Sequence, residues 1–272
     1  MSGTLSTLDS VILGVVEGIT EYLPVSSTGH LVVVQRWLGL GDSVGRDAAD
    51  TYAIAIQVGA ILAVLLLYRR RVSSMLNGVI GRDVDGRRLL GLLVASFIPA
   101  AALGAAFGDA IKDELFSPGP VVIAWVVGGV FLLLWKPRTD GVGVTSLTAK
   151  GAVTIGIAQA LALWPGVSRS LVTIAAAVLV GLSLSAALEY SFLLGLATLS
   201  AATVFDLAKN GGELFDAYGI ARPVLGVLIA FVTAAVSVRW LVRYLAERPL
   251  SHFGWYRLAA AVVTLALWST LS

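Results

Sequence analysis

The chain reads Glu17-Gly-Ile-Thr-Glu21-Tyr-Leu-Pro24-Val-Ser26-Ser27-Thr28-Gly29-His30 near its start and Gln159-Ala-Leu-Ala-Leu-Trp-Pro165-Gly166-Val-Ser168-Arg169-Ser170-Leu-Val-Thr173 past its middle. Apolar sequence flanks both stretches. Ionisable and hydroxyl groups inside apolar sequence cost several kcal/mol unless each finds a partner or a ligand. Because such groups cluster in these two stretches, the stretches are the candidate active site.

The composition indicates an integral membrane protein. Hydrophobic residues make up 57% of the chain and charged residues 13%, and the mean hydropathy is +0.89, whereas soluble domains carry roughly 25% charged residues. The 272 residues suffice for about six to eight spans of ~20 residues. The chain has no long polar segment that could fold as a soluble domain. Residues 1–272 are therefore predicted to form one membrane domain. Cysteine is absent, and the first ten residues show no removable signal peptide.

The predicted fold is all-α, with six transmembrane helices and two re-entrant helical hairpins. Six apolar runs are long enough to cross a bilayer; they cover residues 50–68, 88–108, 118–136, 184–206, 222–245 and 254–271. Residues 8–38 and 149–182 differ, since each contains two short apolar runs separated by a break with a proline. Protein or a water-filled cavity must cover such broken elements at membrane depth. This favours re-entrant hairpins, with one kinked span at each place as the alternative.

Arginine placement predicts the topology. The most basic connection, residues 69–88, is expected in the cytoplasm together with residues 136–150 and 243–257. The connections at 109–117 and 206–222 are then outside, as are both termini. The two hairpins therefore open from opposite sides of the membrane.

Opposite hairpins predict an inverted-topology repeat, with one unit at about residues 5–137 and the other at about 147–272. The sequence shows an echo, because Gly14-Val-Val-Glu17 resembles Gly156-Ile-Ala-Gln159 and Pro24-Val-Ser-Ser27 resembles Pro165-Gly-Val-Ser168. Inverted repeats bring discontinuous helices together near the midplane. We therefore expect the two breaks to meet and form one site.

Glu17 and Glu21 are candidate catalytic residues and metal ligands. Four residues apart, they share one face of a helix, and two carboxylates this close in a low dielectric repel each other. A divalent metal, Arg169 or protonated His30 would relieve the repulsion, and Mg²⁺ would typically be shared with substrate phosphates. A helix face that looks into water is the alternative.

Ser26, Ser27 and Thr28 form a hydroxyl run at the expected start of the second hairpin helix. One of them is expected to cap that helix, but three hydroxyls exceed what a cap needs. A serine near His30 at a helix start suits an activated nucleophile. For His30 the alternative is a buried histidine satisfied by its neighbours.

Arg169 indicates an anion site. A cation at a helix N-terminus opposes the macrodipole, so a compensating anion is expected. Ser168, Ser170, Thr173 and the free backbone N–H groups add donors, and together they favour phosphate. The alternative is an ion pair with Glu17 or Glu21 and no ligand.

At these residues the chain resembles the undecaprenyl-pyrophosphate phosphatase family, also known as the bacitracin-resistance family. Two long motifs carry the resemblance: Glu-x-x-x-Glu followed by Pro-Val-Ser-Ser-Thr-Gly-His, and Pro-Gly-x-Ser-Arg-Ser-x-x-Thr. Both are present without departure, and the similarity extends over essentially the whole length. Residues 57–64 and Trp164-Pro-Gly are also similar to that family.

The resemblance implies an enzyme of the plasma (inner) membrane that removes the terminal phosphate of undecaprenyl pyrophosphate, yielding the lipid carrier of cell-wall glycan precursors. It also implies a site on the extracytoplasmic side and dependence on a divalent cation, Mg²⁺ or Ca²⁺. We expect Ser27 to attack phosphorus while His30 or Glu21 accepts its proton, assisted by Glu17 and Arg169. The alternatives are attack by His30 or directly by water. The expected substrate-binding residues are Ser26, Thr28, Ser168, Ser170 and Thr173.

A second function class is a lipid-phosphate transporter or flippase, because inverted repeats with broken helices are also a transporter architecture. The expected partner in both cases is a polyprenyl pyrophosphate or phosphate lipid, and no nucleic acid. The sequence leaves the oligomeric state open, and a homodimer is compatible with it.

Overall fold

The computed structural model describes residues 5–40, 46–137 and 140–267. Within these ranges the secondary structure is helical, with one isolated bridge between Val142 and Leu182. The helices in chain order are α1 Thr7–Thr20, α2 Ser27–Trp37, α3 Arg46–Leu67, α4 Arg69–Val79, α5 Val84–Leu115, α6 Pro118–Leu134, η1 Val144–Ser146, α7 Ala149–Gln159, η2 Ala160–Leu163, α8 Arg169–Leu179, α9 Leu184–Tyr218, α10 Ala221–Glu247 and α11 Ser251–Ala266.

Four of the described helices are long and apolar enough to cross a membrane. They cover Asp47–Leu67 in α3, Val84–Leu115, Leu184–Tyr218 and Ala221–Glu247, and shorter apolar helices occupy Pro118–Leu134, Ala149–Leu163 and Arg169–Leu179. The all-helical, multi-pass class predicted from composition is confirmed. The six crossings remain a prediction.

Two connections expected as loops are largely helical, while their place outside the membrane stays a prediction. Residues 109–115 continue α5 and residues 206–218 continue α9, although their charges suggested connections outside the membrane. Neither segment contains a proline, and α9 continues until Gly219, whose φ of +65° ends it. Arg257 was counted both in the cytoplasmic connection 243–257 and in the apolar run 254–271, and it lies inside α11. Charge alone does not end a helix, whereas a glycine with positive φ commonly does.

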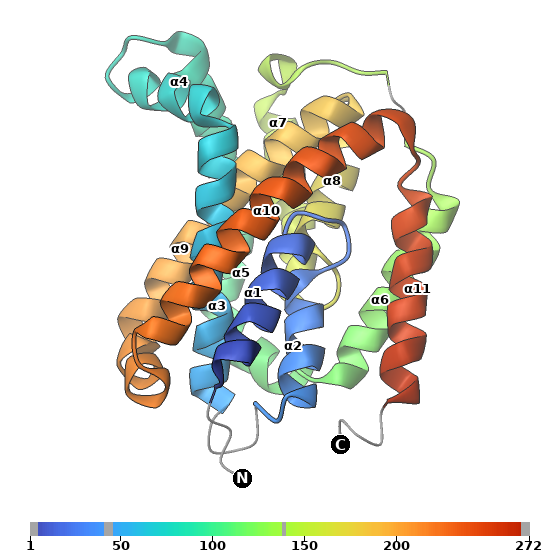
Figure 1. The fold of residues 1–272 in the computed structure, drawn as a ribbon. Coiled ribbons are helices and arrows are strands. Elements are labelled where there is room, and N and C mark those ends of the chain that lie inside the picture. Colours follow the sequence, from blue (N-terminus) through green and yellow to red (C-terminus); the bar gives the residue numbers. More distant parts are fainter. Residues whose placement is uncertain (1–4, 41–45, 138–139, 268–272) are drawn as a thin grey trace.

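Two helical hairpins lie at the centre of the fold. In Figure 1, α1 runs inward and α2 returns to the same end, where α11 also ends, while α4 projects from the opposite end. We call residues 21–26, between α1 and α2, the first break, and residues 164–168, between η2 and α8, the second break. The hairpin α1–α2 packs against α10, and the hairpin α7–α8 packs against α5 and α9.

The hairpin helices approach the long helices at backbone distance. A Cβ added at Gly18 would lie 2.5 Å from the Ala230 carbonyl oxygen on α10, and one at Gly156 would lie 2.4 Å from the Ser96 carbonyl oxygen on α5. Small residues at helix crossings permit such contact in membrane proteins. The hairpins are therefore held by close backbone packing.

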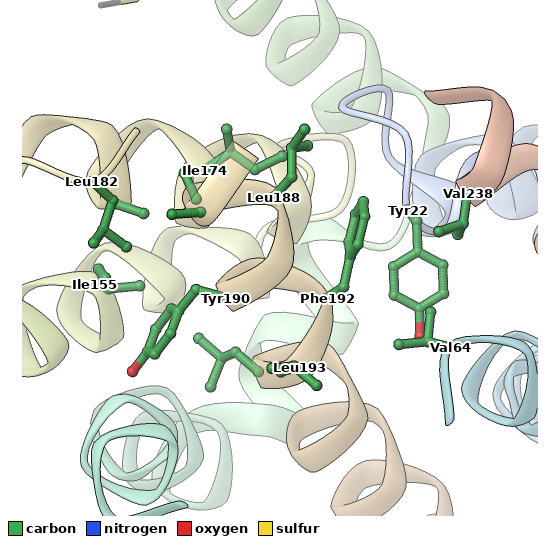
Figure 2. Close-up of a cluster of buried hydrophobic side chains, with 14 of the residues drawn as sticks. Tyr22, Val64, Ile155, Ile174, Leu182, Leu188, Tyr190, Phe192, Leu193 and Val238 are labelled. Carbon is green, nitrogen blue, oxygen red and sulfur yellow. The ribbon is translucent and has the colours of Figure 1, made fainter. Parts of the chain in front are cut away.

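A buried cluster around α9 packs against the first break (Figure 2). Tyr22 of the first break meets Phe192 edge to face, with ring centroids 5.3 Å apart and an interplanar angle of 82°. On the other side, the Tyr190 hydroxyl donates to the Leu92 carbonyl at 2.9 Å and lies 2.7 Å from Ser96 Oγ. The central helix α9 thus connects the first break to α5.

Candidate active site

Both breaks end in the same rare backbone conformation. Ser26 has φ 73° and Ser168 has φ 78°, and they are the only non-glycine residues with positive φ in the described chain. Their hydroxyls cap the following helices, since Ser26 Oγ accepts from Gly29 N at 3.3 Å and Ser168 Oγ from Leu171 N at 3.2 Å. Such conformations cost about 1–3 kcal/mol each and persist where surrounding contacts enforce them, often at active sites.

The caps correct the alignment of the two breaks. The sequence comparison paired Ser27 with Ser168, but the structurally equivalent residues are the caps Ser26 and Ser168. The cause is one additional residue between Pro165 and its cap. Ser27 and Arg169 are therefore equivalent, each being the first residue of its helix.

The two breaks meet, as the sequence predicts. The Gly166 amide donates to Ser26 Oγ at 3.1 Å, and Ser170 Oγ donates to the Leu23 carbonyl at 2.7 Å. Each break therefore fixes the other through a buried hydrogen bond.

Glu21 joins the equivalent positions. One of its carboxylate oxygens, Oε2, accepts a short hydrogen bond from Ser27 Oγ, and Oε1 accepts one from Arg169 Nη2 at 2.9 Å. Both Glu21 and Ser27 are buried. The hydroxyl of the first residue of α2 and the guanidinium of the first residue of α8 thus bind the same carboxylate.

Arg169 is held by several contacts that leave one of its N–H donors unused. Its Nη1 donates to the Ser191 carbonyl at 3.0 Å, and its Cζ lies 5.5 Å from the centroid of the Tyr22 ring. The buried Nε has no hydrogen-bond partner within the part of the chain that the structure describes. Gly195 makes room for the group, because a Cβ there would lie 2.6 Å from Nη1. The ion pair considered from the sequence is present, and a donor remains for an anion.

Glu17 is a buried carboxylate, and neither of its oxygens has a hydrogen-bond partner among the described residues. The described ranges contain no group of three or more His, Cys, Asp or Glu side chains that could hold a metal alone. Glu17 and Glu21 nevertheless fit a divalent cation whose remaining ligands are substrate oxygens and water, the usual arrangement for Mg²⁺.

His30 bonds elsewhere. Its Nδ1 lies 2.7 Å from the Ser26 carbonyl oxygen and its Nε2 lies 2.8 Å from the Tyr256 hydroxyl. The ring packs on Trp125 and Tyr256, with centroids 4.7 and 5.6 Å away. The geometry therefore corresponds to the satisfied histidine, while Glu21 is the group bonded to Ser27.

The remaining hydroxyls of the second motif form a buried network. Ser168 Oγ lies 3.0 Å from Ser170 Oγ, and Thr173 Oγ1 lies 2.6 Å from Ser191 Oγ and donates to the Arg169 carbonyl at 2.7 Å. Thr28, the second residue of α2, is partly exposed. The network holds the start of α8 in place around Arg169.

Sequence reasoning missed the contribution of α11. Tyr256 binds His30, and Arg257, which is fully buried, donates to carbonyls of both breaks. The available signal was an arginine inside the apolar run 254–271, which membrane energetics makes expensive.

Comparison with known proteins agrees with the two motifs. The family model described as "Bacitracin resistance protein BacA" matches residues 10–263. The chain belongs to this family. In this family member the matched region starts in α1, contains both breaks and ends in α11.

Three similar proteins are named as undecaprenyl-diphosphatases. An undecaprenyl-diphosphatase of Sorangium cellulosum is 47% identical over 95% of this chain and 85% of its own length. Undecaprenyl-diphosphatase 2 of Rhodospirillum rubrum is 43% identical over 97% of this chain and 96% of that protein. Undecaprenyl-diphosphatase 1 of Burkholderia lata is 44% identical over 94% and 93%.

Proposed function

We propose that this membrane enzyme hydrolyses undecaprenyl diphosphate to undecaprenyl phosphate and inorganic phosphate. The names of its relatives support this substrate. The observation that carries the proposal is the Glu21 carboxylate, which binds the Ser27 hydroxyl and the Arg169 guanidinium in one buried place. The proposed nucleophile and the proposed anion-binding cation therefore both contact the proposed base.

Ser27 is the proposed nucleophile and Glu21 its base. Ser27 Oγ bonds to the terminal phosphorus while its proton moves to Glu21, and the bond from phosphorus to the bridging oxygen breaks, so that undecaprenyl phosphate leaves. Water then attacks the phosphoserine, releasing phosphate and restoring the serine. Glu21 is preferred to His30 because Ser27 is hydrogen-bonded to Glu21, and a base must reach the proton it takes.

Arg169 and the two helix starts are the proposed diphosphate site. The unpaired Nε of Arg169 and the N-terminal amides of α2 and α8 supply donors and positive potential for the charge on the transferring group. Thr28 would contribute a further donor. Ser26, Ser168, Ser170 and Thr173 act mainly by holding these donors in position.

Glu17 and Glu21 would hold the divalent cation, Mg²⁺ or Ca²⁺. When bound, the cation would neutralise part of the diphosphate charge. The support is the buried Glu17 carboxylate, whose oxygens have no other partner.

The proposed membrane arrangement has six crossings, α3, α5, α6, α9, α10 and α11, plus two re-entrant hairpins, in the plasma (inner) membrane. The helix contacts support inverted repeats at 5–137 and 147–272: α1 packs on α10 as α7 packs on α5, and α6 packs on α11. The arginine-rich α4 is assigned to the cytoplasm, which puts the start of α1, the end of α11 and the opening of the site outside.

Phosphate release by purified protein in detergent tests the function. With undecaprenyl diphosphate and Mg²⁺, one phosphate per lipid is expected, with chelator and Ser27→Ala as controls. The repeat symmetry also favours a second candidate, transport of a lipid phosphate. Transport in proteoliposomes without phosphate release in detergent would replace the first proposal with the second.

A further inference from the structure

Arg257 is a buried cation without a carboxylate partner. Its side chain is fully shielded from solvent in α11, and none of the ion pairs found among the described residues includes it. A charge at such depth is expensive unless its donors are satisfied. Such a residue demands a structural explanation.

All five guanidinium donors of Arg257 go to backbone carbonyls. Nε donates to Trp125 at 3.5 Å, Nη1 to Pro24 at 3.2 Å and Val167 at 3.3 Å, and Nη2 to Ala124 at 2.9 Å and Gly166 at 2.7 Å. No donor is left for a substrate. In this it differs from Arg169, whose Nε is unpaired.

The accepting carbonyls belong to three segments. Pro24 lies two residues before the cap Ser26, Gly166 and Val167 immediately precede the cap Ser168, and the other two acceptors lie on α6. The planar guanidinium of Arg257 therefore connects both breaks next to their strained caps and anchors them to α6. Positive φ at a serine persists only where its surroundings enforce it.

The seat is shaped for a guanidinium. A Cβ on Gly128 would lie 2.3 Å from Arg257 Nη2, so the glycine leaves the required space. Lysine could not replace arginine here, because a lysine ammonium has three donors around a point and cannot reach five carbonyls spread over a plane.

We infer that Arg257 is a positioning residue that holds the two breaks in register, so that Ser27 and Arg169 reach the same Glu21 carboxylate. Arg257 acts through the backbone and does not touch the substrate. The inference rests on the proposed function only for its kinetic readout; its geometric readout is independent of the reaction.

Distances between the hairpins test the geometry. The chain has no cysteine, so cysteines introduced at Trp37 and Leu179, the exposed last residues of α2 and α8, would carry spin labels at only those two places. In Arg257→Lys we expect a broadened or shifted label–label distance distribution. Arg248→Lys, which changes an exposed arginine at the end of α10, should leave the distribution as in the parent protein.

Kinetics test the consequence. Misplacing reacting groups by about 1 Å costs on the order of 100-fold in rate, so Arg257→Lys should lower kcat by about that factor. KM should change much less, because Arg169 and the helix N-terminal amides still offer donors to the diphosphate while their alignment with Ser27 changes. Gly128→Ala, which intrudes on the guanidinium, should reproduce both effects in a chain that keeps Arg257, and remains available if Arg257→Lys does not fold.

Wild-type kcat with an unchanged distance distribution in both variants would overturn the inference. Loss of turnover with an unchanged distribution would also overturn it, because Arg257 would then act on the reaction directly. If the wild-type protein releases no phosphate, the proposed function fails, whereas the distance measurement still decides the role of Arg257.

Discussion

The first and second breaks have the same backbone conformation at their caps, but the hairpins that contain them carry different charges. Each ends in a serine cap with positive φ, and each starts a helix of 11 residues. The first hairpin, however, contributes Glu17, Glu21 and Ser27, whereas the second contributes Arg169. The acid, the hydroxyl and the cation meet only because the two hairpins face each other.

The difference shows how a repeated backbone supports one asymmetric site. Glu17 is echoed by Gln159, which is also buried and has an unpaired polar atom, Nε2. The equivalent first helical residues are Ser27 and Arg169. The repeated backbone supplies two sets of helix N-terminal donors, and side-chain replacement divides the chemistry between them.

The largest loss of activity is expected from removing the Ser27 hydroxyl, which follows the first break at the start of α2. Ser27→Ala should lower phosphate release at least about 1,000-fold, a loss typical of a nucleophile. Ser185→Ala, which removes an exposed serine of α9, is the matched control and should retain wild-type turnover. Ser27→Ala with more than a tenth of wild-type activity would end the proposed role of the first break.

The next largest loss of activity is expected from changing Arg169, the cation that follows the second break at the start of α8. Arg169→Lys keeps the charge but has its three donors on one nitrogen, so it cannot reproduce the separate contacts of Nη1 with the Ser191 carbonyl and Nη2 with Glu21. We expect kcat/KM to fall about 100-fold, as in the loss of a transition-state donor. Arg243→Lys, at an exposed position of α10, serves as control. Equal rates for Arg169→Lys and this control would reject the anion-binding role.

A smaller effect is expected from making the hairpins alike. Glu17→Gln places in the first hairpin the amide that the second has at Gln159. The Mg²⁺ concentration for half-maximal activity should rise at least about tenfold, as for weakened metal sites. Direct Mg²⁺ or Mn²⁺ binding, measured calorimetrically with product present, should weaken in parallel. An unchanged metal dependence would remove Glu17 from the proposed cation site.

The smallest effect lies outside both breaks, at the corner between α4 and α5. Hydrogen bonds from Ser74 Oγ and the Gly86 amide lower the pKa of Asp83 below its ordinary value of 3.8. A lowered folded-state pKa stabilises the protein above pH 3.8 and loses this contribution as the pH falls through the folded-state value.

Asp83→Asn should therefore lower the melting temperature at neutral pH by a small amount that shrinks toward pH 3, without changing turnover. Melting curves of both proteins across that pH range give the comparison. A difference independent of pH would show that the Asp83 charge is not what stabilises the corner.

The sequence predicted what local chemistry determines. Apolar runs indicated the helices, prolines with neighbouring hydroxyls indicated the breaks, and the expected inverted repeat indicated that the breaks meet. The helical ends at 109–115 and 206–218 were missed because charge was taken as the sign of a loop. Spacing from the proline indicated Ser27 as the equivalent of Ser168, whereas the structural equivalent is Ser26. The equivalence depends on φ at the cap, which spacing from a proline does not determine.

Contacts between distant helices explain the other differences. Nothing near His30 in the sequence indicates Tyr256, and nothing near Arg257 indicates carbonyls 90 or more residues away. These partners become neighbours only when α11 packs on α6. The base assignment accordingly changed from a choice between His30 and Glu21 to Glu21, on the basis of the hydrogen bond to Ser27.

The most direct measurement is a rapid acid quench of wild-type protein turning over undecaprenyl diphosphate labelled in its terminal phosphate, followed by peptide mapping. Covalent label on the peptide that contains Ser27, assigned to that serine and absent from Ser27→Ala, is the predicted result. Label on His30, or full turnover with no label on the protein at any time, would contradict a site in which Ser27 attacks phosphorus beside Glu21 and Arg169.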